Sequence, residues 1–149
     1  MISDLTYANI EDVLTRCFLQ YWANGTPVIL KNAVPQELPN SVEAWVYFTV
    51  YKNASRQDSF GRDGNRRFVR IGRVFVEIFV KAAIVTGLMN DLASQAIDFY
   101  EGDQWSPMRM LYITQHDLPD GAHRRASITG DGRWFGTQVN IQWAFDEVK

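Results

Sequence analysis

The sequence offers few side chains that could act as the base beside a serine or cysteine nucleophile. A serine or cysteine nucleophile needs a neighbouring base, and His116 and His123 are the only histidines. The single cysteine, Cys17, lies on the apolar face of a predicted helix, where we expect a small core side chain rather than a nucleophile. A single cysteine also excludes an intramolecular disulfide and a zinc site built from thiols.

A metal site is the second kind of chemistry to consider. His116, Asp117, Asp120 and His123 are suitable ligand types within one short segment. That segment contains proline and glycine, so it has none of the fixed spacing that a helix would give to metal ligands. The sequence also lacks a glycine-rich phosphate loop between a strand and a helix, and it lacks paired carboxylates at a fixed spacing. We therefore predict no metal, no cofactor and no enzymatic activity.

A cluster of arginines is the clearest candidate for a binding function. Residues 52–73 contain seven cations and two anions, although the whole chain of 149 residues has a formal net charge of -2. Arginine makes bidentate contacts with acidic groups, so the cluster is suited to an acidic protein surface or a phosphate backbone. A solvated loop without any partner is the alternative. The residues that we expect to contact a partner are Arg56, Arg62, Arg66 and Arg67, with Phe60 between them.

The arginine cluster lies on a predicted hairpin. Alternating apolar and polar residues predict strands over 43–52 and 68–80, and the polar segment 53–67 connects them. A connection of this length in a compact domain is usually functional or disordered. The sequence Gly61-Arg62-Asp63-Gly64 resembles a glycine-flanked RNA-binding loop, but that loop joins helices, so we interpret it here as a hairpin tip.

The rest of the chain predicts two helices and three further strands. The helices follow from apolar residues at steps of three and four, and the last strand follows from strict alternation. These segments are 7–23 and 86–100 for the helices, and 27–31, 108–116 and 135–146 for the strands.

Loops are predicted over 32–40, which contains two prolines, and over 117–132. The whole order predicts an α+β fold in a single domain, residues 1–149, with two helices packed on a mostly antiparallel sheet and one long hairpin with an extended polar tip. The N-terminal residues lack the pattern of a signal peptide, and charges interrupt the most apolar stretch, 74–85, so we expect no membrane span.

Aromatic residues are unusually frequent in this chain. The sequence has five tryptophans, six tyrosines and nine phenylalanines. Side chains of this size are buried either in a core or in contacts between subunits. Since most of them fall on predicted helix and strand positions, we expect most to be core residues and a minority to be available for interfaces.

The arrangement of these segments resembles the tail terminator, or tail completion, family of long-tailed, siphovirus-like bacteriophages. The resemblance covers nearly the full chain and rests on order more than on any single motif. It is carried by the helix start Tyr7-Ala8-Asn9-Ile10, the strand Pro27–Asn32, the aromatic strand Ala44–Val50, the tip with Gly61 and Gly64, the strand Arg70–Phe79, the helix entry Thr86-Gly87, and Gly132-Arg133-Trp134-Phe135.

The resemblance implies a structural virion protein in the neck region of the tail, made in the host bacterial cytoplasm. It implies a homohexameric ring on the head-proximal end of the tail tube, which stops polymerisation of the tube. The implied partners are other copies of the chain, the major tail tube protein and the head-tail connector or head completion protein. Genomic DNA would pass through the ring without sequence-specific binding, and no membrane would be involved.

A nucleic-acid-binding module is the alternative function. In that hypothesis the arginines of the tip bind phosphate and Phe60 stacks on a base. The two hypotheses differ in salt response, because phosphate binding weakens steeply as salt rises.

Overall fold

The computed structural model describes residues 5–22, 26–31, 43–59, 61–81, 86–118 and 134–149. The helices are α1 (Ile10–Tyr21) and α2 (Thr86–Glu101), followed by a short 3-10 helix, η1 (Asp103–Trp105). The strands are β1 (Val28–Leu30), β2 (Ala44–Gln57), β3 (Arg67–Lys81), β4 (Arg109–Asp117) and β5 (Trp134–Val148).

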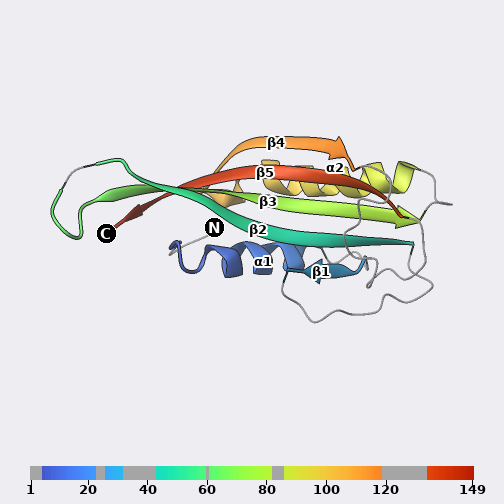
Figure 1. The fold of residues 1–149 in the computed structure, drawn as a ribbon, viewed down its shortest axis with the longest axis horizontal. Helices are drawn as coiled ribbons and strands as arrows, with labels where there is room; N and C mark the ends of the chain where they lie inside the picture. Colours follow the sequence, from blue (N-terminus) through green and yellow to red (C-terminus); the bar gives the residue numbers. More distant parts are fainter. Residues whose placement is uncertain (1–4, 23–25, 32–42, 60, 82–85, 119–133) are drawn as a thin grey trace.

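The five strands form one sheet in the order β1-β2-β3-β5-β4 (Figure 1). β1 runs parallel to β2, and the other three pairs are antiparallel. The predicted α+β fold, with two helices on a mostly antiparallel sheet, is confirmed.

Both helices pack on the same face of the sheet. The register places Phe48 opposite Val76 and Val76 opposite Val139, so these three side chains share one face. They belong to a core that also contains Leu14 of α1 and Leu92 of α2. The periodic apolar positions of the sequence therefore become one continuous core between the helices and the sheet.

The opposite face of the sheet has a smaller apolar cluster at one end. Trp45, Tyr47, Phe79 and Trp134 are buried there, and Trp45 stacks on Phe79 with 4.5 Å between ring centroids. All five tryptophans of the chain are buried. The expectation that most aromatic residues are core residues is confirmed.

The hairpin of β2 and β3 differs from the prediction. The segment 53–57 was predicted as loop, but it continues β2 and pairs with β3, after a bulge between Lys52 and Ala54. This half of β2 is exposed on both faces, so polar side chains are accommodated on each face and no alternation appears in the sequence. Only residues 58–66 connect the two strands.

The end of this hairpin projects beyond the helices (Figure 1). β5 extends alongside it, since Val148 pairs with Arg67 and the Lys149 N–H donates to the Arg66 carbonyl at 2.9 Å. We use "the arm" for residues 53–59, 61–71 and 144–149. The arm is thus built from three strands over most of its length rather than from an isolated hairpin.

Most other boundaries agree with the predictions to within three residues. The loop predicted over 32–40 and residues 119–132 of the loop predicted over 117–132 lie outside the described residues. Asp117 was assigned to the second loop, but it is the last residue of β4, where it pairs with Thr137. Neither α1 nor α2 has the length and apolar character of a membrane-crossing helix.

Candidate assembly interface

The root of the arm is fixed by a buried ion pair. The Arg70 Nε–H donates to Glu147 at 2.8 Å, and a second guanidinium N–H donates to the Ser55 hydroxyl. The side chains of Arg70 and Glu147 are 6% and 14% exposed. Arg70 was counted in the predicted cationic cluster, but its charge is neutralised inside the arm.

Aromatic rings enclose the same guanidinium. The Arg70 guanidinium carbon lies 4.9 Å from the ring centre of Tyr7 and 5.0 Å from that of Phe68. Tyr7 precedes α1, and its backbone N–H donates to Glu147 at 3.3 Å. Lys52 donates to the Tyr7 carbonyl at 3.0 Å. These contacts join the arm to the start of α1, so the arm has a defined direction relative to the body.

The predicted partner residues lie at the outer end of the arm, and most of them form ion pairs within it. Arg67 pairs with Asp58, and Arg56 lies 3.6 Å from the same carboxylate. Arg66 lies 3.2 Å from Asp63. Phe60 is outside the described residues.

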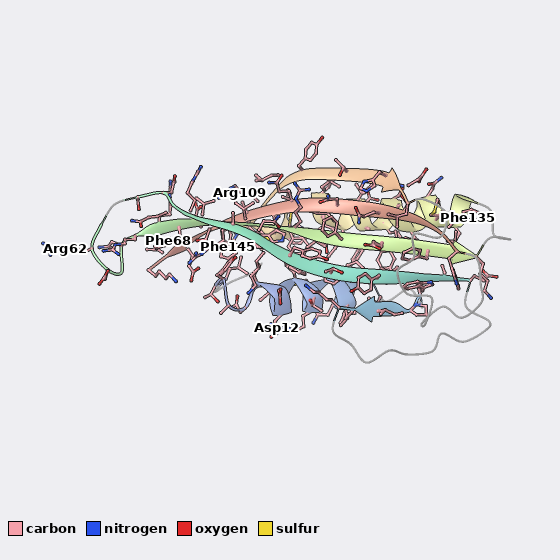
Figure 2. All side chains as sticks on the ribbon, viewed as in Figure 1. Asp12, Arg62, Phe68, Arg109, Phe135 and Phe145 are labelled. Carbon is pink, nitrogen blue, oxygen red and sulfur yellow. The ribbon has the colours of Figure 1, made fainter. Side chains whose placement is uncertain are left out.

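Arg62 differs from these arginines. It is exposed at the far end of the arm (Figure 2) and makes no ion pair with any residue that the structure describes. Gly64 adopts a positive φ of 92°, which glycine allows without strain, and the Asn65 N–H donates to the Arg62 carbonyl at 2.9 Å. The glycine-flanked tetrapeptide is therefore a hairpin tip, as predicted.

The structure corrects the expectation that this segment is strongly positive. Its pairing with β5 brings Asp146 and Glu147 into it, and Asp146 also pairs with Arg109 at 3.3 Å. The sequence window could not reveal this, because Glu147 and Arg70 are 77 positions apart. The arm is a mixed-charge surface with an unpaired cation at its tip.

Asp58 provides a test of the tip geometry. The hydrogen bond and the positive charge of Arg67 hold the pKa of Asp58 below its ordinary value of 3.8. Its contribution to stability is therefore present above the unfolded-state pKa and is lost as the pH falls through the lower folded-state value. In the variant Arg67→Gln we expect the pKa of Asp58 to rise, as measured by NMR titration of the side-chain carboxyl carbon. An unchanged pKa would show that the ion pair is absent in solution.

The sheet face opposite the helices is partly open beyond the small apolar cluster. Tyr51 is exposed and meets Phe75 edge-on, with 5.2 Å between ring centroids. On β4, Leu111 and Tyr112 are also exposed. Among the described residues, the other exposed large apolar side chains are Leu19, Tyr21, Phe135 and Val148.

Two grooves flank the helices. One, of 240 Å³, lies between α1 and the β1–β2 edge and has both charge signs at its wall, in Glu11, Asp12 and Lys31. The other, of 390 Å³, lies between the end of α2 and β4. Its apolar lining is Trp105, Met108, Met110 and Ile113, and its charged residues are Glu101 and Asp103. Sequence reasoning missed the second groove, because three separate elements form it.

The cysteine and the candidate metal ligands of the sequence do not form a reactive site among the described residues. Cys17 is half-buried against the core, and burial raises the pKa of its thiol, which keeps it protonated at neutral pH. His116 and Asp117 are exposed on β4, whereas Asp120 and His123 lie outside the described residues. Within the described ranges, no three histidine, cysteine or acidic side chains are grouped as metal ligands.

Comparison with known proteins supports the fold. No protein-family model matches the chain, and no curated protein matches it. The chain is similar to a solved structure with a TM-score of 0.53 and 13% sequence identity, over 89% of this chain and 93% of the other. At this identity the likeness extends to the fold alone.

Proposed function

We propose that this chain is a structural subunit of a bacteriophage tail, of the tail terminator kind. Six copies would form a ring on the head-proximal end of the tail tube, stop its polymerisation and offer a face to the head connector. The proposal rests on the order of sequence segments that resembles this family, and the α+β fold is compatible with it. It concerns assembly rather than catalysis.

The arm is the observation that carries this proposal. Ordering a polypeptide segment costs conformational entropy, which core burial normally offsets. In the arm, residues 51–57 of β2 are exposed on both faces, and the structure is fixed instead by strand pairing and by the buried Arg70–Glu147 pair. A rigid projection with little core of its own is suited to contacts with another chain.

The charge distribution favours assembly over nucleic-acid binding. A phosphate-binding surface needs several cations without internal partners. In the arm, Arg56 and Arg67 share Asp58, and Arg66 has Asp63. A surface that carries both charge signs is instead suited to a protein partner whose charged groups are arranged to complement it.

Tube length tests the proposal. The purified chain is added while its tail tube protein assembles, and tube lengths are measured by electron microscopy. We expect shorter tubes with a ring at one end. Open-ended tubes of unchanged length would overturn the proposal, and DNA binding that falls steeply with salt would favour the alternative function.

A matched variant isolates the role of the arm. Replacing residues 58–67 by Asn-Gly joins Gln57 to Phe68, which already pair, through a two-residue turn. The body should remain folded, as measured by its thermal unfolding, while the effect on tube length is lost. A shortened arm that still limits tube length would contradict the role of the arm.

A further inference from the structure

The groove between α2, η1 and β4 lies beside a group of acidic side chains that no basic residue of α2 or η1 balances. The outer face of α2 presents Asp91, Asp98 and Glu101, and Asp103 follows in η1. All four are exposed, and neither α2 nor η1 contains a lysine or arginine. We call these four residues the acidic face. None of them forms an ion pair with the residues that the structure describes.

Three members of the acidic face, Asp98, Glu101 and Asp103, lie at or just beyond the C-terminal end of α2, where negative charge is unfavourable. Helix C-termini carry partial negative charge and favour cations, whereas the last turn of α2 contains Asp98 and Glu101 and no basic residue. A cation supplied from outside would remove this repulsion. The groove adjoins that place, since Glu101 and Asp103 line it together with Trp105, Met108 and Met110.

The arm supplies the matching cation. Arg62 is exposed at its tip without an ion pair among the described residues, and Arg66 and Arg67 lie behind it. The arm of a chain cannot fold back onto its own groove, because β3 is paired with β5 along its whole length, from Arg67 to Lys81. Figure 2 shows Arg62 projecting away from the body. A contact between the tip and the groove must therefore join two copies.

We propose that the arm tip of one copy docks in the groove between α2, η1 and β4 of a second copy, with Arg62 against Glu101 and Asp103. The contact is heterologous, since a different surface is used on each copy, and repeating it generates a ring or a filament. This inference rests on the proposed function, for which it names the contact between neighbouring subunits.

The other exposed surfaces match the charge of the arm tip less well. The groove beside β1 contains Lys31 as well as Glu11 and Asp12, so its charge is mixed and does not select a cation. On the open sheet face around Tyr51, Lys31 lies over the Tyr51 ring and Arg73 pairs opposite Tyr51, so the nearest charges are positive and do not match the arm tip. Complementary charge therefore favours the groove beside η1.

Cross-linking tests the contact on the full chain without the tail tube. Cysteines are introduced at neutral neighbours of the contact, as Asn65→Cys beside Arg62 and Ser106→Cys in the lining of the groove, so that the charged residues are kept. Both are placed in one chain, in a Cys17→Ala background, and are linked by a short bis-maleimide. Because the contact is heterologous, we expect a ladder of covalent species beyond the dimer, whereas either cysteine alone should give no species larger than a dimer. The ladder should weaken as salt rises.

The matched control is the pair Asn65→Cys and Thr15→Cys, which places the second thiol at the other groove, again in place of a neutral hydroxyl side chain. An absent ladder, or an equal ladder in this control, would overturn the proposed contact. Adding Glu101→Lys to the first pair should lose most of the ladder. A ladder without any effect on tube length would support the contact and overturn the terminator function. An effect on tube length without a ladder would support the terminator function and overturn the contact.

Discussion

Replacing Arg70 by methionine is expected to lower the free energy of unfolding by about 3–5 kcal/mol. Methionine has similar length but leaves the Glu147 carboxylate, which is only 14% exposed, without its cation, and the Ser55 hydroxyl also loses its donor. Removing one member of a buried pair costs this much because the remaining charge is desolvated and uncompensated. Chemical denaturation followed by the fluorescence of the five buried tryptophans measures the change.

Two variants make this prediction specific. Arg62→Met removes the same charge at an exposed tip position without an ion pair among the described residues, so we expect a change within about 0.5 kcal/mol. The double variant Arg70→Met with Glu147→Leu removes both charges and should recover most of the loss, because an apolar pair of similar volume replaces the ion pair. A double variant as unstable as Arg70→Met alone would contradict this account of the arm root.

Replacing Gly72 by valine is expected to lower the free energy of unfolding by at least about 3 kcal/mol. A Cβ atom at this position would lie 2.1 Å from Cζ2 of Trp143 and 2.2 Å from the carbonyl oxygen of Tyr51. Trp143 is fully buried, and the second obstacle is backbone, so neither can move aside cheaply. The two strands must separate or the indole must leave the core.

Gly87 is the matched control for this substitution. It lies in the first turn of α2, and a Cβ atom there would meet none of the residues that the structure describes within 4 Å. Gly87→Val is therefore expected to change the free energy of unfolding by less than about 1 kcal/mol, since glycine itself is the weaker helix former. Equal effects of the two substitutions, measured by the same denaturation experiment, would mean that Trp143 does not cover Gly72 in solution.

The sequence predicts well those helices and strands in which the same face is buried along the whole element. α2 and the central parts of β2, β3 and β5 each have a buried face, and their apolar periodicity is visible in the chain. The continuation of β2 over 53–57 was missed because backbone pairing with β3 forms that strand, and neither of its faces is buried. No side-chain pattern distinguishes such a strand from a polar loop.

The candidate interface was predicted only in part. Arg56, Arg62, Arg66 and Arg67 were placed on one hairpin, and the structure does place them at the end of one arm. What the sequence could not provide is their pairing, since the sequence does not show which carboxylates neighbour them in space. Arg70 and Glu147 meet through the register of β3 and β5, and the groove beside η1 depends on three elements brought together by folding.

The bulge between Lys52 and Ala54 decides which arginine has which role. Side chains alternate between the two faces of a strand, so one additional residue shifts the phase of everything beyond it. Because of this shift, Ser55 lies opposite Arg70 on the helix side, and Arg56 lies opposite Val69 on the open side. If β2 paired with β3 without the bulge, Arg56 would lie opposite Phe68 on the helix side, which is the side on which Arg70 and Glu147 meet. A single bulged residue thus places Arg56, which pairs with Asp58, on the side of the arm away from the Arg70–Glu147 pair.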